Sequence, residues 1–232
     1  MTTRELTMLA SIMALVGCSE VAGPAGEQAL QVTVRVVGGV GGSVAVAASP
    51  GALAAASVDI ERVALVLGGL KLETAGTDGT KDWVFAQSVV VPLDLAGEPV
   101  LVFDTGVPAG TYKELEVSVD KLEAGNPAEE SLIAAWPELA DASVLVAGTV
   151  TSEGASPRAF TFTAPLDIDL ELPFESPIVF AGDGDPVTLV SLAIDLSGWF
   201  LGTGGLLDPS DPANRSAIES NIEASVEVHQ VK

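Results

Sequence analysis

Apolar and polar residues alternate along several short stretches of this chain, and this pattern limits the fold more than any other feature. Successive side chains of a strand point to opposite faces, so such alternation predicts a strand buried on one face only. The pattern is clearest in QVTVRV (31–36), ELEVSV (114–119), FTFT (160–163) and LDIDLEL (166–172). Further strands are predicted at 59–73, 83–95, 100–103, 143–151, 187–196 and 224–231.

The predicted strands are joined by segments rich in turn residues. Asp78-Gly79, Pro108-Ala109-Gly110 and the GDGDP stretch (182–186) are of this kind. Many short strands with such connections predict a mainly β protein, an antiparallel β-sandwich with one short helix near the C-terminus.

That helix is predicted at 212–223. Asp211 can cap it, Pro212 suits its first position, and Ile218 and Ile222 would share one face. The sequence also allows a second helical segment within 126–139, which Pro137 would stop. The Gly/Ala/Ser-rich stretch 38–57 is predicted to be a loop, although its SVAVAA (43–48) could form a short edge strand.

The start of the chain has the pattern of a secretory signal. An apolar run of twelve residues, LTMLASIMALVG (6–17), follows Arg4. A run of this length is too short to span a bilayer and suits a signal that is removed. The sequence LVGC (15–18) resembles the lipobox of bacterial lipoproteins, which implies cleavage before Cys18 and acylation of that residue. Cys18 is the single cysteine of the chain, so no second thiol can pair with it.

This interpretation divides the chain into three parts. Residues 1–17 are the signal peptide, 18–28 a tether, and 29–232 a β-sandwich domain with its core at 30–195 and its helix and last strand at 196–232. The predicted location is the cell envelope, with a lipid anchor in the membrane. Ser19 after the cysteine favours the outer over the inner membrane, by resemblance to enterobacterial sorting.

Composition limits the partners. The formal net charge is −22, which disfavours binding to nucleic acid. Hydrophobic residues make up 48% of the chain, enough to form a core despite this charge. The acidity is explained by solubility or salt adaptation, or by attraction for cations and basic partners.

A set of motifs resembles a recurrent domain of bacterial surface lipoproteins that has no assigned function. It comprises Ile60-x-x-Val63-x-Leu65, the LDL at 93–95, and Pro108-x-Gly110-x-Tyr112 before a long strand. The resemblance implies a prealbumin-like or carbohydrate-module-like β-sandwich over about residues 30–195. Tyr112 is expected to fix a hairpin corner through its hydroxyl group.

Catalytic motifs are scarce, and the chain is predicted not to be an enzyme. His229 is the single histidine, and the alternation of VEVHQV (226–231) places it on the solvent side of a terminal strand. Nucleophilic hydrolysis usually needs a histidine base, and zinc sites need histidine or cysteine ligands. The 32 acidic residues leave open a hydrolase that acts on envelope polysaccharide through paired carboxylates.

No cofactor is predicted, and weak calcium binding is the metal interaction left open. Asp183 and Asp185 are the first choice, because loop carboxylates can form weak calcium sites. Similar groups occur at Asp208, Asp211 and Asn214 and at Asp78 and Asp82. Acidic residues of turns also accept hydrogen bonds from the backbone, which is the competing explanation for each group.

Exposed aromatic rings are common platforms for sugars, and Trp83 and Trp136 are the candidates for ligand binding. Packing at the rim of the core is the alternative for both. The favoured function is a non-catalytic envelope lipoprotein with a binding or structural role, its partner a glycan, an envelope protein or Ca²⁺.

The lipobox leads to a direct prediction. Cys18→Ser removes the thiol that would receive the lipid, so metabolic labelling with a radioactive fatty acid should be lost and the protein should leave the membrane fraction. Ser19→Ala is the matched control and should be labelled normally. Equal labelling of the Cys18→Ser protein would contradict the lipobox interpretation.

Overall fold

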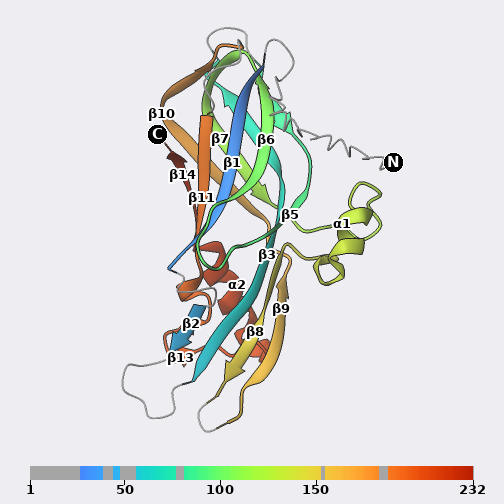
Figure 1. Ribbon diagram of the computed structural model, residues 1–232, viewed down its shortest axis with the longest axis vertical. Helices are drawn as coiled ribbons and strands as arrows, with labels where there is room; N and C mark the ends of the chain where they lie inside the picture. The colour runs from blue at the N-terminus through green and yellow to red at the C-terminus, as the bar shows by residue number, and fades with distance from the viewer. Residues whose placement is uncertain are drawn as a thin grey trace, which may run out of the picture.

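Two β-sheets pack face to face in a sandwich (Figure 1). The computed structural model describes residues 27–38, 44–47, 56–76, 81–152, 155–182 and 188–231. The four-stranded sheet has the order β14 (Val226–Val231), β11 (Thr188–Asp195), β1 (Glu27–Val37), β6 (Val100–Pro108). β1 and β11 pair in parallel, and the other two pairs of this sheet are antiparallel.

The eight-stranded sheet is antiparallel throughout its described pairs. Its main order is β10 (Ile168–Phe180), β7 (Gly110–Val119), β3 (Ser57–Thr74), β8 (Val144–Thr151), β9 (Arg158–Ala164). Three short strands also pair with β3: β2 (Val44–Ala47), β4 (Trp83–Phe85) and β5 (Val89–Pro92). A separate hairpin consists of β12 (Leu201–Gly202) and β13 (Gly205–Leu206). The predicted antiparallel β-sandwich is confirmed.

Strand β3 organises this sheet because it is paired along both edges. Residues 57–65 pair with β8 and residues 67–74 with β7. β2 pairs with 57–60, β5 with 64–67 and β4 with 70–72. A strand has two edges, so each short strand must lie on the edge opposite to the long strand that shares its β3 residues. Figure 1 shows β3 running through both halves of the molecule.

The core lies against the inner face of the large sheet. In one half the four-stranded sheet covers it; in the other half, residues 196–226 do so (Figure 1). Trp199 and Phe200 of that segment are fully buried. The Phe200 ring meets Phe160 of β9 edge-on, with 5.7 Å between ring centroids. The C-terminal segment therefore replaces the second sheet where β3 and β8 extend beyond it.

The C-terminal helix is confirmed, with a 3₁₀ start. Pro212–Asn214 form one 3₁₀ turn (η3), and α2 continues from Arg215 to Glu223. Asp211 caps the turn, since its Oδ1 accepts from the Ala213 amide at 2.9 Å. Ile218 and Ile222 are both fully buried, as their spacing predicts.

Two details differ from the sequence-based prediction. The stretch 83–95 contains two short strands, β4 and β5, and residues 86–88 between them do not pair with β3. The helix left open at 126–139 is short, with α1 at Glu130–Ala135 and a 3₁₀ turn (η1) at Pro137–Leu139. Pro137 interrupts the hydrogen bonding that would join them. No helix among the described residues is long and apolar enough to cross a membrane.

The hairpin between β6 and β7 is fixed by Tyr112, as predicted. Its ring is 1% exposed and meets Phe180 edge-on at 5.5 Å, and its hydroxyl donates to the Pro108 carbonyl oxygen at 3.2 Å. Tyr112→Phe should lower the free energy of unfolding by about 1 kcal/mol, because the hydrogen bond from the Tyr112 hydroxyl to the Pro108 carbonyl is lost. Urea denaturation measures the change. Thr161→Val, on an exposed strand position, should shift the midpoint much less; equal shifts would contradict the role of the hydroxyl.

Candidate functional site

Between β7 and β8 the chain leaves the sheet as an excursion, residues 120–143, that carries α1 and η1. Its two ends are joined by backbone hydrogen bonds. The Leu122 amide donates to the Ala142 carbonyl at 3.1 Å, and the Asp141 amide donates to the Leu122 carbonyl at 2.8 Å. The excursion is thus closed at its base and stands beside the sheet as a compact unit (Figure 1).

The excursion packs on the outer face of the large sheet, opposite the main core. The residues of this contact form a second apolar cluster. Its buried members are Ala64, Val66, Leu122, Leu139, Ala142 and Leu145. Half-buried Val90, Leu132, Ile133 and Trp136 pack around them. β3 is therefore covered on both faces at its middle, which places the excursion firmly on the sheet.

Arg62 adds a polar link between β3 and the end of the excursion. Its guanidinium lies 2.9 Å from the Glu138 carboxylate and 5.9 Å from the centre of the Trp136 ring. The hydrogen bond from Arg62 lowers the pKa of Glu138. These groups are largely exposed, so the link orients the excursion more than it stabilises it.

A cleft of about 900 Å³ lies beside α1, and we call it the α1 cleft. Three segments far apart in the sequence line it: residues 120–132 of the excursion, the 86–88 link between β4 and β5, and residues 165–167 between β9 and β10. Gly68 of β3 contributes backbone to the lining. A volume of this size is typical of small-molecule sites.

The wall of the α1 cleft depends on one buried carboxylate. Glu129 is 9% exposed. Its Oε1 accepts from the Ser88 hydroxyl at 2.8 Å, and its Oε2 accepts from the Glu123 amide at 2.6 Å. Both carboxylate oxygens are thereby used, and the excursion is tied to the link on the far side of the cleft.

Other polar side chains of the cleft are not used internally. Asp120, Lys121, Asp167 and Gln87 line it, and none of them makes a hydrogen bond or ion pair with another residue of the described ranges. They offer carboxylate, amide and ammonium groups to a bound molecule. Asp120 and Asp167 come from different elements, which is the arrangement that an acid/base pair would need.

Gly68 makes room for one of these carboxylates. A β-carbon at Gly68 would collide with Oδ2 of Asp120 and lie 2.8 Å from the Ser118 hydroxyl. The Asp120 carboxylate therefore lies directly over the β3 backbone, at the floor of the α1 cleft.

The residues predicted from the sequence are not brought together in this cleft. Trp83 is half-buried, packs against the main core and stacks on Phe85 with 6.0 Å between centroids. Trp136 is half-buried at the rim of the second cluster. Neither tryptophan is part of the cleft lining. Cys18, Asp183 and Asp185 lie outside the described residues.

His229 is in the backbone of β14, which forms an end of the four-stranded sheet, and its register partner is Ser191. Its side chain is outside the described set, so its predicted position towards solvent stays a prediction.

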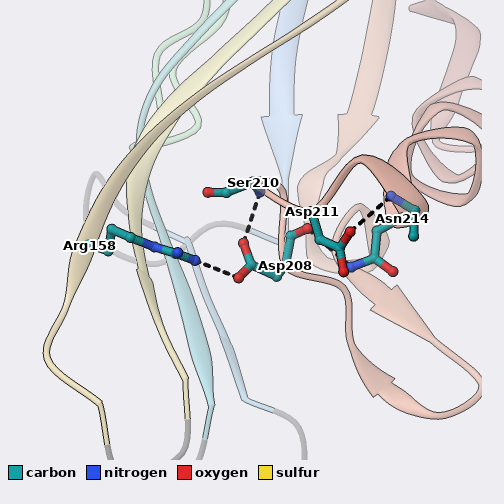
Figure 2. Close-up of polar contacts among 6 residues, drawn as sticks. Arg158, Asp208, Ser210, Asp211 and Asn214 are labelled. Atoms are coloured by element: carbon teal, nitrogen blue, oxygen red, sulfur yellow. Dashed lines mark hydrogen bonds and ion pairs between the residues drawn. The ribbon is translucent and has the colours of Figure 1, made fainter.

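The acidic residues near the C-terminus form hydrogen bonds and an ion pair with neighbouring protein groups (Figure 2). Oδ1 of Asp208 accepts from the Ser210 amide at 2.8 Å, and its Oδ2 accepts from Arg158 at 2.6 Å. The Asn214 side chain donates to the Asp208 carbonyl at 3.1 Å. Asp82, of the third acidic group, accepts from the Thr74 amide at 3.0 Å. Among the described residues, no group of three or more His, Cys, Asp or Glu side chains is arranged to hold a metal ion.

Sequence reasoning did not identify Asp120, Asp167 or Gly68 as site residues. Asp120 follows the alternating strand 114–119, and Asp167 is a polar residue of the alternating stretch 166–172, so neither differs from the usual polar residues of a strand or its end. The adjacent glycines 68 and 69 inside a predicted strand were the available signal, because glycine in a strand interior often marks a bulge or a close approach by another group.

Comparisons with known proteins add little. No protein family and no curated protein matches the chain. Among solved structures, MbnP from Methylosinus trichosporium is similar at 18% sequence identity with a TM-score of 0.39, over 89% of this chain and 99% of that one.

Glu129 can be tested as the anchor of the cleft wall. Glu129→Gln places an amide nitrogen near one of its two donors, the Ser88 hydroxyl or the Glu123 amide, so the free energy of unfolding should fall by about 1–3 kcal/mol. Glu130→Gln removes the same charge at an exposed neighbouring position and should change it by less than about 0.5 kcal/mol. Urea denaturation of both proteins decides: equal midpoints would mean that Glu129 is not an anchor.

Proposed function

We propose that this protein is a non-catalytic, lipid-anchored binding protein of the cell envelope, and that the α1 cleft holds its ligand. The observation that carries the proposal is a cleft of about 900 Å³ lined by polar side chains that have no partner among the described residues. Such a combination of size and convergent polar groups is the usual mark of a ligand site. The lipobox-like LVGC at 15–18 supports the envelope location.

The construction of the cleft also supports binding rather than a purely structural role. The excursion is held by its closed base, the second cluster and Glu129, while Asp120, Lys121 and Asp167 have no side-chain partner within the described part of the chain. A rigid frame with unsatisfied polar groups loses little conformational entropy when a ligand binds.

A second candidate is a hydrolase that acts on envelope polysaccharide. Asp120 and Asp167 line the same cleft from different elements, so they are the pair that could act as acid and base or nucleophile. Release of reducing ends from envelope polysaccharide by the full-length protein, abolished by Asp120→Asn or by Asp167→Asn, would replace the binding proposal with this one.

The binding proposal can be tested inside the cell. A photo-crosslinking amino acid is placed at Ser131, which is exposed and lines the α1 cleft, and in a control protein at Ala159, which is exposed on β9. Irradiation should give a discrete adduct with an envelope component from Ser131 and not from Ala159. The Cys18→Ser protein should lose the adduct, because it leaves the envelope. No adduct at Ser131 beyond the control would overturn the proposal.

A further inference from the structure

The α1 cleft does not end at Gly68. A second hollow of about 210 Å³ has Gly68 and Ala86 in its lining, and both residues also line the α1 cleft. The two hollows therefore meet at these residues and form one elongated groove. We call it the outer groove, because it follows the face of the large sheet that points away from the main core.

Two glycines of β3 lie beside the second hollow. Its lining includes Gly68 and Gly69 together with Lys71 of β3, Glu116 and Ser118 of β7 and Val84 of β4. A β-carbon at Gly69 would lie 2.5 Å from the Phe85 carbonyl oxygen, and its φ of +154° is one that other residues rarely adopt. Gly69 is itself buried and the Asp120 carboxylate lies over Gly68, so the two glycines let the Phe85 carbonyl and Asp120 lie close to the β3 backbone.

The walls of the second hollow combine an ion pair with apolar side chains, among them Leu70, Val84 and Phe85. The ammonium group of Lys71 lies 2.9 Å from the Glu116 carboxylate, and this hydrogen bond raises the pKa of Lys71. Val84 is 61% exposed beside them, although it is a strand residue. A neutral ion pair and an apolar side chain form a surface that a ring with polar edges and an apolar face can cover.

Charge in the α1 cleft narrows the ligand class further. Its lining holds the carboxylates of Asp120, Glu123, Glu129 and Asp167 and the ammonium group of Lys121, a formal charge of −3. Anionic polymers are repelled by such a site. The lining offers amide, carboxylate and hydroxyl groups to a ligand that both donates and accepts hydrogen bonds.

We infer that the outer groove binds an extended, neutral polysaccharide chain, with one part in the α1 cleft and the next part in the second hollow beside Lys71 and Val84. This inference rests on the proposed function and names the ligand class of the same site. A hydroxyl-rich chain supplies donors and acceptors for Gln87, Asp120 and Asp167, and a ring of the chain can pack against exposed Val84.

The test uses the detergent-solubilised full-length protein on an array of neutral glucose- and N-acetylglucosamine-based oligosaccharides of two to eight units, with uronic acid oligosaccharides and peptides alongside. Calorimetry then measures the best neutral series. A groove of two joined hollows predicts that affinity rises at least about tenfold from disaccharide to hexasaccharide, as the second hollow adds contacts to those of the first.

Ala86→Arg places a long side chain where the two hollows meet. It should weaken hexasaccharide binding at least about tenfold and change disaccharide binding less than about twofold. Ala109→Arg, at an exposed turn position outside the groove, should leave both unchanged. Circular dichroism confirms that each variant is folded.

Four outcomes would overturn the inference: no neutral oligosaccharide is bound, affinity does not depend on length, Ala86→Arg has no selective effect, or peptides or uronic acid chains bind best. Adducts at Ser131 without glycan binding would reject the inference and leave the proposed function standing. Absence of both would reject the two together.

Discussion

Pairing along both edges of β3 is the interaction on which the rest of the structure depends. Its 18 residues form ladders with β2, β4, β5, β7 and β8, so each sheet neighbour takes its position from one backbone. Because side chains alternate along a strand, a shift of one residue in any of these ladders would turn its apolar residues towards solvent. The core, the outer face and the excursion are all placed relative to this one strand.

β3 keeps its apolar residues inside only because its alternation is interrupted twice. The residues of β3 that face the main core are Val58, Ile60, Val63, Leu65, Leu67, Leu70 and Leu72. Two of these intervals are three residues long, and the ladders shift register at the same places, between Ile60 and Arg62 and between Leu67 and Gly69. Each irregularity is a bulge that restores the inward face.

Glycine accommodates both bulges. At the first, a β-carbon on Gly148 of β8 would collide with the Asp59 carbonyl oxygen. At the second, Gly68 and Gly69 are themselves in β3. The Ile60-x-x-Val63 spacing, which carries the resemblance to a lipoprotein domain, is the sequence trace of the first bulge. The second bulge removes side chains from the outer face, and the outer groove is its consequence.

Local features of this fold could be predicted from sequence, whereas the groove could not. The Asp211 cap, the buried Ile218 and Ile222 and the Tyr112 hydroxyl bond each depend on residues a few positions apart. Alternation shows which face of a strand is buried but not which strand lies beside it. The parallel pairing of β1 with β11 and the meeting of residues 86–88, 120–132 and 165–167 depend on such long-range choices.

Positive charge is scarce in this chain, and three arginines use theirs to hold separate segments together. Arg62 joins the excursion to β3, and Arg158 joins β9 to Asp208 (Figure 2). Arg215 donates to the Thr163 carbonyl at 2.6 Å. The neighbouring Ala164 carbonyl accepts from Ser143, so the Thr163 carbonyl points to the other side, the unpaired edge of β9.

These arginines close the places where segments meet, and one of them covers a strand edge that would otherwise invite pairing with another chain. Lys121 does not join two segments in this way. It lies in the α1 cleft and has no ion-pair partner in the described part of the chain. Lys121 is therefore an ammonium donor that the α1 cleft presents beside its four carboxylates. A hydroxyl-rich ligand can accept from Lys121 and donate to the carboxylates at once.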